Sequence, residues 1–160
     1  MKEIVYIETT IVSYLVARSS RDLILSAHQQ LTREWWENER VRYRCITSEE
    51  VLREAMQGER EMAQARIKAL EEVQVVGITA EVEAMAATFM ATGALPPTMR
   101  PDATHLAAAT LSGADYLLTW NCRHLANAHV LRRLQKEAER RGWMLPGVCT
   151  PMELMGDFEP

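Results

Sequence analysis

Short apolar segments alternate with longer stretches of helical periodicity along the whole chain, and this alternation constrains the fold most. The segments expected to form strands are residues 3–8, 41–47, 73–78, 116–119 and 147–149. The stretches expected to form helices are residues 11–17, 22–40, 48–58, 59–72, 79–92, 102–112 and 126–141. Strands separated by helices favour a parallel sheet covered on both faces. With right-handed crossovers, the prediction is an α/β fold: a three-layer α/β/α sandwich around a central parallel sheet of four to five strands.

Residues that favour helix starts precede several of the expected helices. Ser48 and Asp22 are suited to cap free backbone N–H groups at the starts of two of them. Thr9 or Thr10 is expected to cap the short helix that follows the first strand. The inward face of the helix that opens at Asp22 is expected to consist of Leu23, Ala27, Leu31 and Trp35.

Chain length and apolar content indicate one domain with a substantial core. The 160 residues are 48% apolar, and we expect a single domain over residues 1–150 with an acidic tail at residues 151–160. No apolar run approaches the ~18 residues that span a bilayer, and the first residues do not resemble a signal peptide. We therefore expect a cytoplasmic protein without a membrane segment.

Cysteine spacing and net charge exclude two further classes. Cys45, Cys122 and Cys149 are odd in number and lack CxxC spacing, which argues against a disulfide framework or a zinc knuckle. They are expected to be reduced and mostly buried. The net charge of −4 argues against a protein that coats nucleic acid non-specifically, but not against a nuclease.

Four polar residues lie where this topology would bring them together. Glu8 and Asn121 follow the apolar runs IVYI and YLLT, and Glu54 and Asp102 lie in the helical segments next to strands. The carboxyl ends of parallel strands share one edge, where ligands bind. Three carboxylates there would repel one another unless a cation lay between them, and oxygen ligands suit Mg²⁺ or Mn²⁺. The pattern therefore indicates metal-dependent phosphoryl transfer.

Each of the four residues also has a purely structural interpretation. Glu8 can point to water or accept from the N–H groups of the next helix, and Glu54 can be an ordinary exposed glutamate. Asp102 follows Pro101 in a first helical turn, where aspartate commonly caps. Asn121 is typical of a tight turn.

Neighbouring residues supply further candidates. Thr9 or Thr119 is expected to orient a water or a phosphate oxygen, and His105 to lie either at the core edge or beside the acids. The residues expected to bind phosphate, or alternatively to form a solvated helix face, are Arg123, Arg132 and Arg133, with Lys136, Arg140 and Arg141 beyond them.

The segments VYIETTIVSYL, SEEVLREAMQG, PDATHLAAATLSGADYLLTWN and CRHLAN together resemble a PIN domain, in particular the VapC-type toxins of toxin–antitoxin pairs. The resemblance runs from Val5 to about Thr150. It implies a ribonuclease that uses Mg²⁺ or Mn²⁺, with Glu8, Glu54 and Asp102 as metal-binding acids and Asn121 at the position of a fourth acid. It also implies a homodimer masked by a small antitoxin.

Two departures from the family pattern keep an alternative open. The first acid is usually aspartate but is Glu8 here, and the fourth acid is replaced by neutral Asn121. The alternative is a catalytically weak or inactive PIN-like domain that binds protein or nucleic acid. The residues expected at partner interfaces, or otherwise in the core, are Tyr14, Leu15, Leu25 and Trp36.

Overall fold

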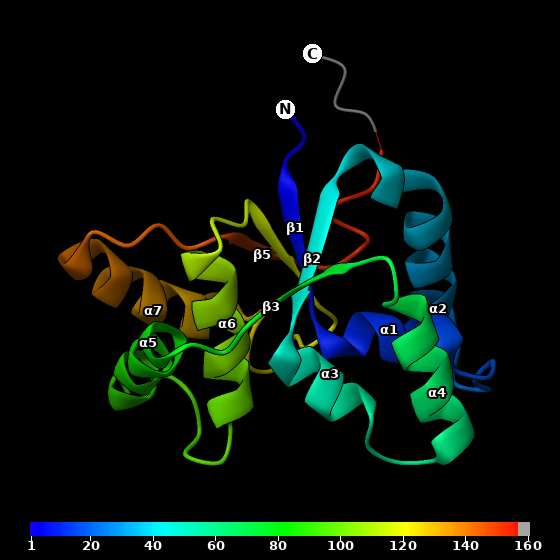
Figure 1. Cartoon of the computed structure of the whole chain (residues 1–160), viewed down its shortest axis with the longest axis horizontal. Coiled ribbons are helices and arrows are strands. Elements are labelled where there is room, and N and C mark those ends of the chain that lie inside the picture. The colour runs from blue at the N-terminus through cyan, green and yellow to red at the C-terminus, as the bar shows by residue number, and fades with distance from the viewer. Residues whose placement is uncertain (157–160) are drawn as a thin grey trace.

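A five-stranded sheet runs through the centre of the computed structural model, which describes residues 1–156 (Figure 1). The strand order is β3-β2-β1-β4-β5, and every neighbouring pair is parallel. The strands are β1 (Ile4–Ile7), β2 (Arg44–Ser48), β3 (Gln74–Val76), β4 (Tyr116–Leu118) and β5 (Gly147–Cys149). The predicted α/β class with a parallel central sheet is confirmed.

Helices cover both faces of the sheet and complete the three layers. Helices α5, α6 and α7 lie on one side, and α1, α2 and α4 on the other, while α3 lies near the carboxyl ends of the strands (Figure 1). Their bounds are α1 (Thr9–Val16), α2 (Leu23–Glu34), α3 (Glu49–Ala55), α4 (Arg60–Ala69), α5 (Ala80–Ala91), α6 (Arg100–Leu111) and α7 (Ala128–Arg141). Helix α2 continues through a π-helical turn (Trp35–Glu39) and a 3₁₀ turn (Arg40–Arg42).

Helix α6 is the most buried helix and links the sheet to α5. Every residue from Ala103 to Ala109 is buried. Alanine dominates this segment, so the backbone of α6 can approach its neighbours closely. A helix that is apolar on all sides belongs in the interior, and this burial holds the first turn of α6 rigidly against the sheet.

The direction of the chain crossovers changes between β1 and β4. The chain leaves β1 into α1 on one side of the sheet and leaves β4 toward α7 on the other (Figure 1). The two strand ends are level, since Glu8 N donates to the Leu118 carbonyl at 3.1 Å. A switch of this kind opens a crevice at the carboxyl edge of a sheet, where α/β proteins bind ligands.

The predicted inward face of α2 is confirmed only in part, since Trp35 is buried and Leu31 half-buried, while the two earlier residues are not. Leu23 is 86% exposed and Ala27 is also exposed, whereas Gln29 and Thr32 are buried. These polar residues face inward because they have partners there. Thr32 Oγ1 accepts from Trp120 Nε1 at 2.7 Å, and the Gln29 amide bonds the backbone of the preceding loop. Simple helical periodicity does not reveal such partners.

The third strand is shorter and more exposed than predicted. β3 spans three residues at the sheet edge, and Gln74 and Val75 are exposed rather than buried. Its single neighbour, β2, explains the exposure.

At the other end of the chain, Trp35 Nε1 donates to the Leu154 carbonyl, so the first tail residues lie against the domain. Tail residues 157–160 lie outside the described residues.

The three cysteines are free, but they differ in burial. Cys149 is buried and Cys45 half-buried, whereas Cys122 is exposed in the turn after Asn121, contrary to the prediction for that residue. Burial raises the pKa of the Cys149 thiol to about 12 and that of Cys45 to about 11. Both thiols therefore stay protonated at neutral pH.

Within residues 1–156, no helix combines the length and apolar character needed to cross a membrane.

Two leucines of α6 test the inferred core. Leu106 is fully buried, and Leu111, one and a half turns later, is 43% exposed. We expect Leu106→Ala to lower the free energy of unfolding by about 2–5 kcal/mol, because it leaves a cavity. Leu111→Ala should cost less than about 1 kcal/mol. Urea unfolding measures both, and equal losses would contradict the assignment of α6 to the core.

Candidate functional site

The four polar residues predicted to share a site come from four different elements. Glu8 follows β1, Glu54 lies in α3 after β2, Asp102 lies in the first turn of α6, and Asn121 follows β4. Helix α3 begins where β2 ends because Ser48 caps it, as predicted, with Oγ accepting from Val51 N. These elements meet at the carboxyl edge of the sheet, where side-chain hydrogen bonds join them.

Glu8 is buried, and hydrogen-bond donors surround its carboxylate. It is 4% exposed, and Oε2 accepts from Thr10 N at 2.8 Å. Oε1 accepts from the hydroxyls of Thr10 and Thr119. Glu8 itself therefore caps α1, and the prediction that Thr9 or Thr10 would cap this helix is wrong. A carboxylate is stabilised at a helix N-terminus by the free N–H groups and the dipole.

Glu54 is held by residues from two other elements. Its Oε1 accepts from Thr9 Oγ1 at 2.8 Å and from His105 Nε2. A carboxylate can only accept, so His105 Nε2 carries the proton in this bond whatever the charge of the ring. Thr9 and His105 thus fix the carboxylate through the same oxygen.

A buried chain of hydrogen bonds extends behind His105. Its Nδ1 lies 2.8 Å from Tyr6 Oη, which lies 2.6 Å from Ser48 Oγ. All three side chains are buried. The chain joins β1, the start of α3 and α6, so the orientation of Glu54 depends on the packing of three elements.

The pKa values of His105 and Glu54 move in opposite directions. Burial opposes charge on His105, but the hydrogen bond to Glu54 and the nearby carboxylates outweigh it and raise the pKa of His105. Burial would raise the pKa of Glu54, but the bonds from His105 and Thr9 lower it. Both directions favour an ionised Glu54 beside a protonated His105.

Asp102 is less well satisfied than the other two acids. Its Oδ1 accepts from Asn121 Nδ2 at 3.2 Å, while its buried Oδ2 has no hydrogen-bond partner within residues 1–156. His124 Nδ1 lies 3.5 Å from Oδ2, without hydrogen-bond geometry. Burial raises the pKa of Asp102, and the charges of Glu8 and Glu54 raise it further against the opposing effect of His105 and His124.

Asn121 orients Asp102 through its amide nitrogen. Its oxygen, Oδ1, accepts from His124 N at 3.0 Å in a local turn, and this bond fixes the orientation of the amide. The oxygen of Asn121 is therefore already used within this turn, and its amide nitrogen faces Asp102. Asp102 does not cap α6, since the N-cap residue is Met99.

The acids match a hard cation in charge and in donor type. Three carboxylates from different elements lie close enough for the charges of Glu8 and Glu54 to raise the pKa of Asp102. The buried Oδ2 of Asp102, which has no hydrogen bond within residues 1–156, can act as an oxygen ligand. Within residues 1–156, however, no three acidic, histidine or cysteine side chains are already grouped tightly enough to hold an ion.

The predicted phosphate-binding arginines do not belong to this cluster. Arg123 and Arg132 are exposed, and Arg133 donates to the carbonyls of Thr92 and Gly93 after α5. Asp115, a further acid next to β4, is at the opposite end of that strand, where it accepts from Ile4 N at 2.7 Å.

Sequence reasoning missed three residues that support the acids: Tyr6, Thr10 and His124. Tyr6 occurs inside an otherwise aliphatic strand, and a buried phenol needs a hydrogen-bond partner. That requirement was the available signal. Thr10 and His124 gave none, because their roles depend on turns whose geometry the sequence does not specify.

No protein-family model and no curated protein matches the chain. Solved structures do match. The VapC20 toxin of Mycobacterium tuberculosis, described as cleaving the sarcin–ricin loop, aligns with a TM-score of 0.55 at 20% identity over 71% of this chain and 86% of its own. VapBC2 of Rickettsia felis, bound to a DNA fragment from its promoter, aligns with a TM-score of 0.54 at 14% identity over 92% of this chain and 98% of its own. The chain therefore has the fold of VapC-type PIN domains.

Neutralising Asp102 should stabilise the folded protein. Asp102→Asn removes a buried charge near Glu8 and Glu54, and we expect it to raise the free energy of unfolding by about 1 kcal/mol without added metal. Asp115→Asn is the matched control, because Asp115 is exposed and hydrogen-bonded. It should give no gain. A destabilised Asp102→Asn protein would show that the ionised carboxylate supports the fold.

Removing one hydroxyl tests the chain behind Glu54. Tyr6→Phe keeps the ring but leaves His105 Nδ1 and Ser48 Oγ without their shared partner, so we expect a loss of about 1–3 kcal/mol. Tyr116→Phe removes a hydroxyl that makes only a 3.5 Å contact to Glu3, and should cost less than about 0.5 kcal/mol. Chemical denaturation compares the two. Equal small losses would mean that the buried hydrogen bonds of Tyr6 contribute little to stability.

Proposed function

We propose that this chain is a metal-dependent endoribonuclease of the PIN family, similar to VapC-type toxins. The observation that carries the proposal is the carboxylate cluster at the switch point, in which Asp102 Oδ2 is buried without a donor. Native proteins rarely leave such an atom without a hydrogen bond, because an unsatisfied buried carboxylate oxygen is costly. A site that recruits a cation explains it.

Glu8, Glu54 and Asp102 are the residues that would hold Mg²⁺ or Mn²⁺. The bound ion would stabilise charge on the scissile phosphate and lower the pKa of an attacking water. His105 and Thr9 keep Glu54 ionised and fixed in direction. Asn121 orients Asp102 from the other side, and the chain supplies no covalent nucleophile in this proposal.

Thr119 and Thr10 have a different role from the one predicted for Thr119. Both hydroxyls donate to Glu8, so neither is free to orient a water unless Glu8 releases it. Their effect is to keep the longer glutamate side chain folded back against α1. This arrangement compensates for the methylene by which Glu8 exceeds the aspartate usual in the family.

The matching structures support RNA as substrate and a small antitoxin as partner. One is described as a toxin that cleaves the sarcin–ricin loop, and the other is VapBC2 bound to a DNA fragment from its promoter. A homodimer and a cytoplasmic location remain part of the proposal. Leu23 and Ile24 at the start of α2 are 86% and 71% exposed and are better suited to a partner than Tyr14, Leu15, Leu25 and Trp36, which are all half-buried.

One observation favours the alternative of an inactive binding domain. Glu8 already accepts three hydrogen bonds, and no three ligating side chains are preassembled within residues 1–156. If these bonds do not yield to a cation, the acids are only a buried polar network. The fold would then serve to bind a protein or nucleic acid without cutting it.

Cleavage of total cellular RNA by the purified protein tests the proposal. We expect discrete products with Mg²⁺ or Mn²⁺ and none with EDTA. Asp102→Asn should slow cleavage by more than about 100-fold, because it removes a charged ligand. Asp115→Asn, whose carboxylate lies at the far end of β4, should cleave like the wild type.

Two results would contradict the proposal. Intact RNA under every condition, from a protein shown to be folded, would support the inactive alternative. Equal cleavage by the wild type and Asp102→Asn would mean that a different site or a contaminant cuts the RNA.

A further inference from the structure

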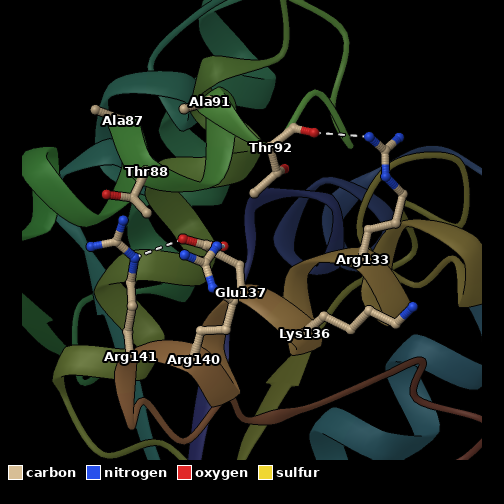
Figure 2. Close-up of a pocket in the computed structure, with 9 residues that line it drawn as sticks. All are labelled: Ala87, Thr88, Ala91, Thr92, Arg133, Lys136, Glu137, Arg140 and Arg141. Carbon is tan, nitrogen blue, oxygen red and sulfur yellow. Dashed lines mark hydrogen bonds and ion pairs between the residues drawn. The ribbon is translucent and has the colours of Figure 1, made fainter.

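A basic groove lies between α5 and α7, away from the acidic cluster (Figure 2). Its volume is about 820 Å³. The α5 side contributes small residues, and the α7 side contributes long charged ones (Figure 2). The lining residues are Ala87, Thr88, Ala91, Thr92, Arg133, Lys136, Glu137, Arg140 and Arg141.

The charge of the groove is opposite to that of the whole chain. Four cations and one carboxylate line it, whereas the chain carries a net charge of −4. Glu137 bonds Arg140 and Arg141, and Arg133 is tied to the backbone after α5. Lys136 has no hydrogen bond or ion pair to any residue from 1 to 156 that would neutralise it (Figure 2). The groove therefore keeps an excess of positive charge.

The arrangement suits a ligand with repeated negative charges. Arg133, Lys136 and Arg140 are spaced three and four residues apart on α7, so they form one row with a rise of roughly 5 Å between neighbours. The facing wall is formed by Ala87 and Ala91, whose small side chains leave room for a chain to lie beside the cations (Figure 2).

The composition of the groove favours a sugar–phosphate backbone over a protein segment. Protein interfaces rely on large apolar or aromatic anchors in pockets. The residues that line this groove include none of that kind. Nucleic-acid backbones are instead held by lysine and arginine side chains without sequence readout.

A second hollow adjoins the groove along the loop that precedes α6. It shares Ala87 and Ala91 with the groove and continues along Gly93–Pro97. This loop leads directly into the first turn of α6, which carries Asp102. A strand that lies in the groove can thus follow the loop toward the acidic cluster.

We propose that the groove between α5 and α7 binds the backbone of single-stranded RNA that flanks the cleavage site. This inference rests on the proposed ribonuclease function. It assigns binding to Lys136 and Arg140, whereas Arg132 lines a different hollow on the other side of α7. Because only phosphates are contacted, binding in the groove is independent of base sequence.

Salt-dependent RNA binding tests this assignment. The probe is a labelled single-stranded RNA of about 20 nucleotides, longer than the usual site of one binding domain. The protein carries Asp102→Asn so that the RNA stays intact, and fluorescence anisotropy gives the affinity over a range of NaCl concentrations. The groove variant is Lys136→Gln with Arg140→Gln, both at exposed positions.

The control removes the same charge elsewhere. Arg60→Gln with Lys68→Gln alters two exposed cations of α4, on the opposite side of the sheet from the groove (Figure 1). We expect the groove variant to lose about tenfold in affinity near 0.1 M salt, with the slope of log affinity against log salt reduced by about 1.4. The control variant should keep the salt dependence of the Asp102→Asn protein from which it is made. Circular dichroism checks that both variants are folded.

Four results would overturn the inference or separate it from the proposed function. An unchanged slope in the groove variant overturns it, as does an equal loss in the control. Polyglutamate serves as a second probe. If the groove variant loses binding to polyglutamate while its RNA binding stays intact, the inference is also overturned, and an acidic protein partner is indicated. If the wild type fails to cleave RNA but the groove variant still loses RNA binding, the groove assignment stands and the ribonuclease proposal fails.

Discussion

The buried carboxylate of Glu8 is the interaction on which the rest of the site depends. It lies at the end of the central strand and accepts from the backbone and hydroxyl of Thr10 and from the hydroxyl of Thr119. These bonds fix the start of α1 and the end of β4 against β1. A buried charge is tolerated only with such donors, and its field then acts on every acid nearby.

The other two acids, Glu54 and Asp102, differ in how well the surrounding residues stabilise their negative charge. Glu54 is stabilised as an anion by His105 and Thr9, which lowers its pKa. Asp102 accepts from an amide on one oxygen, its other oxygen has no hydrogen bond within residues 1–156, and burial raises its pKa. A cation bound at Asp102 Oδ2 would offset the unfavourable burial of this charge, and that gain would favour binding of the ion. Catalytic sites commonly combine groups whose environments push their pKa values apart in this way.

Sequence reasoning predicted the sheet edge but not the contacts within it. Alternating strands and helices, with Ser48 as a cap, were enough to place Glu8, Glu54, Asp102 and Asn121 at one edge, because parallel topology fixes where strand ends lie. Whether Glu8 would face its own helix was left open, since a side-chain torsion decides it. The inward face of α2 was predicted correctly only in part, because tertiary partners, not periodicity, bury Thr32.

Calorimetric titration with Mn²⁺ asks whether the three acids bind an ion irrespective of substrate. We expect saturable binding to the wild-type protein at up to millimolar concentration, and loss of that binding in Asp102→Asn. A ligand that binds only the folded state should also raise the melting temperature of the wild type alone. No binding, or equal binding to both proteins, would mean that the acids form a structural network and not a metal site.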